Sequence, residues 1–190
     1  SISTALNHLL DGSYAVAAQA ARDGLATATA EGLHAYDEWL HSLAAAAALG
    51  AGEHERARGE LESLAATGAQ LRRGDRAFIH YLGSWLAVLE GDTAAANREA
   101  KIGLGVAVEV GIPWLECLAR VSYVQALLSA GDQRGAETQA RAAQLLAQRL
   151  RSPLLEVSAQ LVAATTAMQS RDEEAALVAL SAALTRAREH

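Results

Sequence analysis

Apolar stretches rich in alanine and leucine alternate along the chain with short polar turns, in which glycine stands near an acidic or hydroxyl residue. Alanine and leucine are strong helix formers, so the stretches predict helices and the turns predict where helices end. The last residue of each turn marks a recurring position, and successive markers are separated by 40, 39, 40 and 40 residues. Spacing this regular predicts a helical repeat. The markers are Ser13, Glu53, Asp92, Asp132 and Asp172.

A second recurring position follows each marker by four residues and is always alanine. A larger side chain there would push two helices apart, so we expect a close helix contact at this point. Another joint lies about midway between markers, where Pro113 and Pro153 each suit the first turn of a helix. The unit is therefore a helix, a tight turn and a second helix. The recurring alanines are Ala17, Ala57, Ala96, Ala136 and Ala176.

The pattern predicts five helix pairs. A single hairpin cannot bury its own apolar face, so neighbouring hairpins are expected to stack into a solenoid. We expect residues 1–190 to form one such domain, and to be a fragment of a longer array, because the first helix is short and no polar helix follows the last. The first helices of the pairs are predicted near 2–11, 33–50, 75–90, 113–130 and 153–170, and the second near 14–31, 53–71, 93–110, 133–151 and 173–189.

The pattern G-D-x-x-x-A at Gly91–Ala96 and Gly131–Ala136, with a later G-I-P or R-S-P joint, resembles tetratricopeptide-like repeats, although the period here is near 40 rather than 34 residues. The longer period resembles the helical regulatory region of MalT-like activators in the LuxR superfamily. The resemblance implies a right-handed α-α superhelix of about five repeats that integrates inducer or partner signals. The chain differs from a full-length regulator because it contains neither a phosphate loop nor a basic recognition helix.

Composition narrows the class of protein. Hydrophobic residues make up 51% of the chain and aromatic residues 4%, which argues against a β-sandwich, a β-barrel and a disordered chain. The net charge of −6 argues against direct binding of nucleic acid. A single cysteine excludes an internal disulfide and fits a reducing compartment, so we expect a cytoplasmic protein. No stretch is apolar enough to span a membrane, and no signal peptide is visible.

Two polar columns on the first helices form the candidate binding groove. The residues that stand sixteen, twelve and nine positions before each marker lie on one face of the first helix. In such superhelices the first helices of the pairs usually line the concave surface. The columns form either a groove for a partner or a solvated face held by intrahelical pairs such as Glu116 with Arg120. The candidate residues are Asp37, Arg76, Glu116 and Glu156 in the first column, His41, His80, Arg120 and Gln160 in the second, and Tyr123 beside them.

Other chemistry-bearing residues have simpler interpretations. Trp39 and Trp85 are expected in the packing between repeats, whereas Trp114 opens a helix and is expected to be partly exposed. His34 and His41 stand near acidic residues on one helix, an arrangement more typical of surface pairs than of a metal site. Cys117 has no histidine nearby in the sequence, which favours a packed thiol over a nucleophile. We therefore expect no catalytic residues, no cofactor and no metal.

The sequence as a whole favours a non-enzymatic protein-interaction or sensor module, the regulatory repeat region of a bacterial transcriptional regulator. The alternative is a stand-alone tetratricopeptide-like scaffold that binds a peptide or protein partner. Either module would bind a protein or peptide, and a regulator could also bind a small-molecule inducer. The exposed apolar faces of the end repeats make a homo-oligomer a further expectation.

Overall fold

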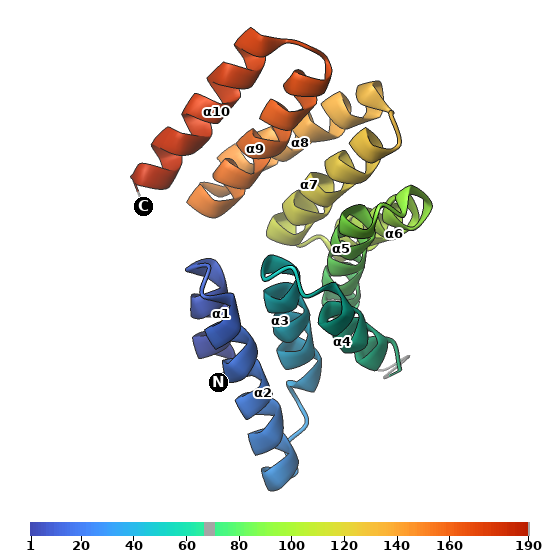
Figure 1. Ribbon diagram of the computed structural model, residues 1–190, viewed down its shortest axis with the longest axis vertical. Coiled ribbons are helices and arrows are strands. Elements are labelled where there is room, and N and C mark those ends of the chain that lie inside the picture. The colour runs from blue at the N-terminus through green and yellow to red at the C-terminus, as the bar shows by residue number, and fades with distance from the viewer. Residues whose placement is uncertain (67–70, 190) are drawn as a thin grey trace.

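The computed structural model describes residues 1–66 and 71–189, and the regular secondary structure of these residues is entirely α-helical. The predicted all-α class and the order of the helices are confirmed. Most helix boundaries agree with the predictions within two residues. Residues 67–70 of the predicted helix 53–71 lie outside the described residues, and residue 71 is not helical. The helices are α1 (Ile2–Leu10), α2 (Tyr14–Glu31), α3 (Asp37–Gly50), α4 (His54–Ala66), α5 (Arg73–Glu90), α6 (Thr93–Val110), α7 (Pro113–Ser129), α8 (Gln133–Leu150), α9 (Pro153–Gln169) and α10 (Glu173–Arg188) (Figure 1).

The start of α3 differs most from the prediction, because the helix begins at Asp37 rather than near residue 33. Gly32 closes α2 in the left-handed conformation, and the Leu33 N–H donates to the Ala28 carbonyl at 2.9 Å, so residue 33 belongs to the end of α2. His34 Nδ1 then lies 2.8 Å from Asp37 Oδ2. This contact between nearby side chains stabilises a turn that precedes α3.

The turns between paired helices have the predicted chemistry. Gly131 follows α7 with a φ of 75°, a conformation that suits glycine because it has no Cβ. The next residue, Asp132, accepts a hydrogen bond from the Gly135 N–H at 2.9 Å and so caps α8. Asp92 and Asp172 cap α6 and α10 in the same way. These turns therefore fix both ends of the helices that they join.

The alanine four residues after each turn is buried, as predicted. The Ser84 hydroxyl on α5 donates across the hairpin to the Ala96 carbonyl at 3.2 Å, a contact that requires the two helix backbones to be close. A larger residue at these positions would separate the helices. Ala17, Ala57, Ala96 and Ala136 have no exposed surface, and Ala176 is 5% exposed.

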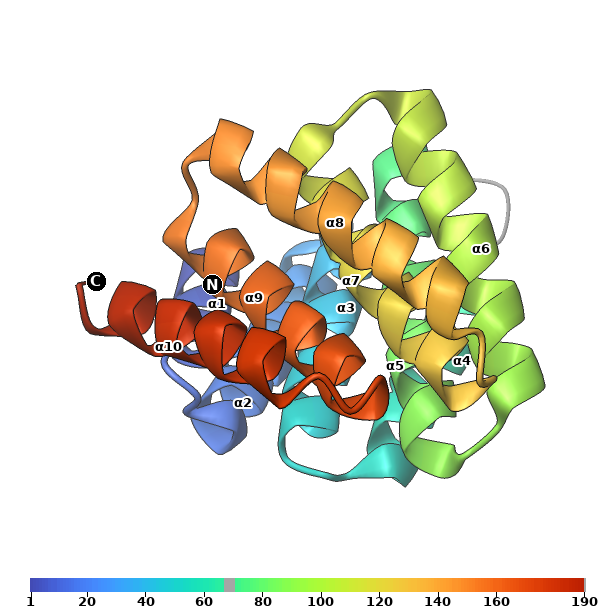
Figure 2. The same ribbon diagram turned by 90° about the horizontal axis from the view of Figure 1, so that it is seen from above.

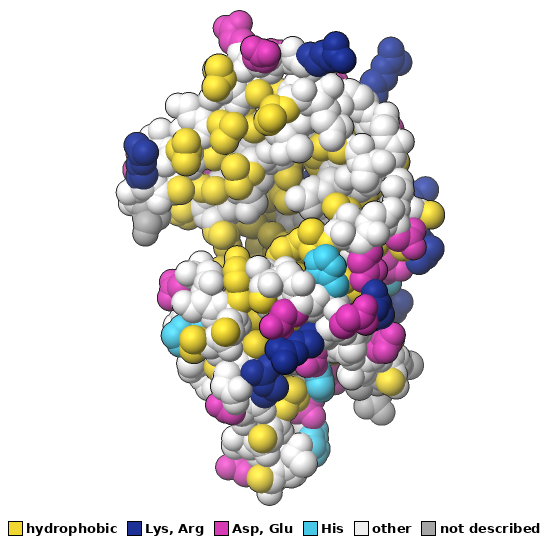
Figure 3. Space-filling view, in the orientation of Figure 1, with side chains coloured by type: hydrophobic (Ala, Val, Ile, Leu, Met, Phe, Trp, Pro, Cys, Tyr) yellow, Lys and Arg dark blue, Asp and Glu magenta, His cyan; other side chains and the backbone are white. Residues whose placement is uncertain are grey.

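The hairpins are arranged in sequence order. Each helix packs against the next one along the chain, and each odd-numbered helix also packs against the next odd-numbered helix. The even-numbered helices make no comparable contacts with one another in the part of the chain that the structure describes. The chain therefore curves, so that α1–α3 lie below α7–α10 in Figure 1 and α9 and α10 lie over α1 and α2 when seen from above in Figure 2. The space-filling view shows a hollow between these two parts of the molecule (Figure 3).

Two arginines are in the left-handed conformation, Arg171 (φ 58°) and Arg151 (φ 51°). Arg171 stands where each of the four earlier turns has glycine, and Arg151 stands where the joints after α2 and α6 have glycine. A side chain in this conformation costs about 1 kcal/mol because its Cβ crowds the backbone. We expect Arg171→Gly to raise the free energy of unfolding by about that amount, measured by urea denaturation. Gly131→Arg is the matched control and should lower it similarly. Equal stability of Arg171→Gly and the unmodified chain would contradict this account.

Two glycines of α6 differ in their surroundings. A Cβ at Gly103 would lie 3.0 Å from the His80 Cβ on α5, whereas a Cβ at Gly105 would meet no atom within 4 Å. Alanine is favoured over glycine inside a helix by about 1 kcal/mol, so Gly105→Ala should stabilise the protein by up to that amount. Gly103→Ala should destabilise it despite the same gain, because the helices must move apart. Thermal unfolding of the two variants checks this, and stabilisation by both would contradict the close contact of α5 and α6.

Candidate functional site

The second predicted polar column bridges the two helices of each of three hairpins. Each column residue is about three-quarters buried or more and pairs with a side chain nineteen residues later, on the following even-numbered helix. The column therefore faces the even-numbered helices. The pairs are His41 Nδ1 with Glu60 Oε2 at 2.6 Å, His80 Nδ1 with Glu99 Oε2 at 2.8 Å, and Arg120 Nη1 with Gln139 Oε1 at 2.6 Å.

The first polar column is held mainly by local partners. Glu116 accepts hydrogen bonds from Nε and Nη2 of Arg120 at 2.9 and 2.6 Å, so the predicted intrahelical pair is present. Asp37 Oδ2 contacts His34, while its Oδ1 is buried without a hydrogen-bond partner among the described residues. Arg76 is exposed. Within the described chain, no hydrogen bond or ion pair joins column residues of different hairpins.

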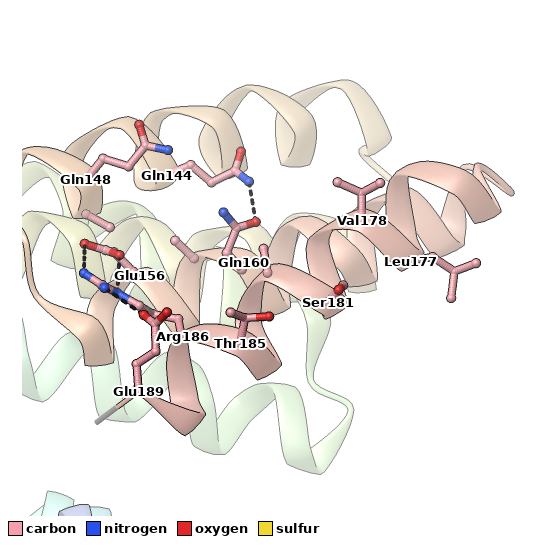
Figure 4. Close-up of a pocket in the computed structure, with 13 residues that line it drawn as sticks. Gln144, Gln148, Glu156, Gln160, Leu177, Val178, Ser181, Thr185, Arg186 and Glu189 are labelled. Carbon is pink, nitrogen blue, oxygen red and sulfur yellow. Dashed lines mark hydrogen bonds and ion pairs between the residues drawn. The ribbon is translucent and has the colours of Figure 1, made fainter.

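The last hairpin departs from this scheme. Residue 179 is alanine, so Gln160 has no polar partner nineteen residues later and instead accepts a hydrogen bond from Gln144 on α8 at 3.0 Å. Glu156 forms an ion pair with Arg186 on α10, with 2.7 Å between Oε2 and Nε. Figure 4 shows both contacts along an open groove of about 810 Å³ between α8, α9 and α10. Of the predicted residues, Glu156 and Gln160 thus line one cavity.

An apolar stripe on the odd-numbered helices lies on the opposite side from the polar columns. The stripe consists of the residues that stand eighteen, eleven, seven and three or four positions before each marker. Because an α-helix turns by about 100° per residue, these residues share one side of the helix, and that side points away from the even-numbered helices. Every well-exposed large hydrophobic residue of the odd-numbered helices falls on this inner stripe. These residues are Leu6, Leu10, Leu89, Trp114, Leu154, Leu161 and Met168.

A row of aromatic rings continues the inner stripe along α3 and α5. Trp39 and Phe78 have ring centroids 5.7 Å apart, Phe78 and Tyr81 are also 5.7 Å apart, and Tyr81 and Trp85 are 6.3 Å apart. Burial raises the pKa of the Tyr81 phenol to about 12. Figure 3 shows hydrophobic side chains inside the hollow between the two parts of the molecule. Hydrophobic side chains therefore line part of the hollow.

The inner stripe was not among the predicted site residues, although its signal is present in the sequence. The aromatic residues of the first helices are noticeable, and Trp39 and Trp85 are partly buried against neighbouring helices as expected. Trp114 is 40% exposed, which confirms its predicted exposure. Tyr123, the predicted residue beside the columns, packs with the alanine-rich cluster of α5, α6 and α7.

The candidate reactive groups are packed or paired. Cys117 is buried and its Sγ–H donates to the Ala143 carbonyl at 3.6 Å, and burial raises the pKa of the thiol to about 11. This confirms the prediction of a packed thiol. His34 and His41 contact different carboxylates, Asp37 and Glu60. Among the described residues, no three His, Cys, Asp or Glu side chains are grouped to hold a metal ion.

Comparisons with protein-family models, with curated proteins and with solved structures found no significant match to this chain. None of the described helices combines the length and the apolar character that crossing a bilayer requires. The function must therefore be argued from the surfaces themselves.

The His41–Glu60 pair predicts a pH-dependent stability. The hydrogen bond to Glu60 raises the pKa of His41 above its ordinary 6.5, against the opposing effect of desolvation. Protonated His41 therefore stabilises the folded state, and this contribution is complete below pH 6.5 and lost as the pH rises through the folded-state pKa. We expect His41→Gln to lower the free energy of unfolding in acid by up to about 1 kcal/mol more than in alkali.

Urea denaturation at about pH 5.5 and about pH 8.5 measures this difference. Glu60→Gln is the matched control, because it removes the carboxylate and should remove the extra cost of His41→Gln in acid. The same cost of His41→Gln at both pH values would show that the pair makes no charge-dependent contribution.

Proposed function

We propose that the chain is a non-enzymatic protein-interaction module that binds an apolar peptide or protein segment along the inner stripe. The observation that carries the proposal is that all the well-exposed large hydrophobic side chains of the odd-numbered helices lie on this one stripe. Gathered apolar surface of this kind typically marks an interaction site. In this proposal the helices form a right-handed, tetratricopeptide-like α-α superhelix of about five hairpins, with a period of about 40 residues.

The division of polar and apolar groups supports binding at the inner stripe. His41, His80 and Arg120 already have partners within their hairpins, so a ligand that used them would first have to break those contacts. A ligand that binds the apolar side chains of the inner stripe has no such hydrogen bonds or ion pairs to break. A partner that covers it gains about 25 cal/mol per Å² of buried apolar area, and aromatic side chains such as Trp114 commonly carry the largest share of binding energy.

Within the same proposal, the module is the regulatory region of a bacterial, cytoplasmic transcriptional regulator and does not itself bind nucleic acid. The support is the resemblance at the Gly-Asp turns to MalT-like regulatory repeats, together with the net charge of −6. The groove of about 810 Å³ between α8, α9 and α10 has the size of a small-molecule site and would receive an inducer. Glu156 and Gln160 would be its polar contacts.

The gene sequence on both sides of the Ser1 and His190 codons distinguishes a regulator from a stand-alone scaffold. A regulator would encode a nucleotide-binding module upstream and a helix-turn-helix downstream. A scaffold would encode neither.

Peptide selection tests the inner stripe directly. A displayed library of random peptides is selected on the chain, and the dissociation constants of the enriched peptides are measured by fluorescence anisotropy. We expect enriched peptides to contain large apolar residues, and Leu161→Asn and Trp114→Ala each to weaken their binding about tenfold or more, because each removes an apolar anchor.

The even-numbered helices offer controls of matched exposure. Leu145 on α8 is 52% exposed against 46% for Leu161, and Ile102 on α6 is 40% exposed, as is Trp114. Leu145→Asn and Ile102→Ala should leave peptide binding unchanged. Enriched peptides that respond to these two variants and not to the inner-stripe variants would refute the proposed site.

A further inference from the structure

The last helix, α10, has an exposed stripe that no other part of the described chain covers. Its buried residues are alanines that face α9, with which it makes its main contact. Five exposed residues follow one another at intervals of four, four, three and four residues on another side of the helix, and they form the outer stripe of α10. These residues are Glu173, Leu177, Ser181, Leu184 and Arg188.

The two leucines of the outer stripe are strongly exposed, Leu177 by 69% and Leu184 by 55%. Residues three and four apart lie on one side of a helix, where they can contact a second helix. Glu173 and Arg188, at the two ends of the stripe, take part in none of the ion pairs among the described residues. The stripe therefore combines an apolar centre with one unpaired charge of each sign at its ends.

The equivalent positions of the preceding even-numbered helices contact the next helix of the chain. Forty residues before Leu177, Glu137 on α8 accepts a hydrogen bond from the Ser170 hydroxyl beyond α9 at 3.1 Å. Forty residues before Leu184, Gln144 donates to Gln160 on α9 at 3.0 Å. Asn97 on α6 likewise donates to the Ala126 carbonyl on α7 at 3.2 Å. This side of an even-numbered helix is thus built to receive another helix.

The order of residues along the outer stripe selects the helix that fits it. When two copies of α10 lie antiparallel, the pairs Glu173–Arg188 and Leu177–Leu184 share one midpoint, which lies between residues 180 and 181. Each acid then meets an arginine, each leucine meets a leucine, and the small Ser181 lies at the centre, where close approach is needed. In a parallel pair, like charges would meet at both ends.

We propose that the chain forms a two-fold symmetric dimer through antiparallel contact of the outer stripes of two α10 helices. The symmetry makes the interface isologous, so each dimer contains two Glu173–Arg188 pairs and two Leu177–Leu184 contacts. One helix pair buries less than the about 1,200 Å² that is typical of stable complexes, so the dimer dissociates in the micromolar range. The dimer does not depend on binding along the inner stripe, which is a different surface. Leu177 and Ser181 of the outer stripe also line the groove between α8, α9 and α10, so the dimer and a ligand in that groove would compete.

Charge reversal combined with mixing tests both the surface and the orientation. Sedimentation equilibrium of the 190-residue chain, at low ionic strength and up to high micromolar concentration, measures the dimer dissociation constant. Glu173→Arg and Arg188→Glu should each raise that constant about tenfold, because two attractive pairs become repulsive. An equimolar mixture of the two variants should recover wild-type dimerisation, since every pair in the mixed dimer is again acid with arginine.

A second pair of variants tests the apolar centre and the geometry. Leu177→Gln should abolish the dimer, whereas Leu145→Gln on α8, also at a well-exposed leucine, should not. In a Cys117→Ser background, Ser181→Cys should form a disulfide-linked dimer under mild oxidation, and Thr138→Cys on the exposed side of α8 should not. Circular dichroism verifies that each variant remains helical.

Three results would overturn the proposal. They are a wild-type chain that remains monomeric at high micromolar concentration, a dimer unaffected by the outer-stripe variants, and a mixture of the two charge variants that dimerises no better than either alone. The peptide selection reports on the hollow independently, so loss of this dimer would leave the proposed function standing, and failure of the selection would leave the dimer standing.

Discussion

The close contact of helix backbones at buried alanines is the constraint on which the rest of the structure depends. Each hairpin has an alanine with almost no exposed surface four residues after its turn, and Gly103 brings α6 equally close to α5. Small residues at these points leave no space between the helices for large side chains. The interior of the described chain is therefore made mostly of alanine, with leucines such as Leu43, Leu82 and Leu115 filling the space that the alanines leave.

This constraint has consequences for both polar and apolar groups. An alanine interface offers little shape to fix how two helices are aligned, and the bridging pairs of His41, His80 and Arg120 supply directional contacts instead. They do so at the same position in successive hairpins. Because these polar side chains are turned toward the even-numbered helices, the opposite side of each odd-numbered helix is left to the aromatic and aliphatic residues of the inner stripe. The packing of the hairpins and the character of the hollow thus have a common origin.

The sequence predicted the local parts of this structure well, because they depend on neighbouring residues. Gly131 and Asp132 end one helix and cap the next through contacts within a few residues, and Pro113 and Pro153 begin helices for reasons of backbone geometry alone. The start of α3 was predicted less well, because the His34–Asp37 contact competes with the helix. The spacing of the polar columns put them on one helix face, but it contained no information on which neighbour that face would meet. Glu60 and Glu99, which pair with the two histidines, belong to other helices and could not be identified from the spacing within α3 and α5.

The even-numbered helices show how one position can serve two kinds of contact. On α8, residues 133, 137 and 144 are polar, and each makes a hydrogen bond to α9 or to the turn after it. On α10, the corresponding residues are Glu173, Leu177 and Leu184, an acid and two leucines that remain exposed. Hydrogen bonds suit a contact whose partner is held in place by the chain, because geometry is then fixed in advance. Apolar contacts with charges at the ends suit a partner that arrives from solution, since burial supplies the affinity and the charges select the orientation. The residue types of α10 therefore suit the proposed contact between two copies of this chain, whereas those of α8 suit the contacts that α8 makes within the described chain.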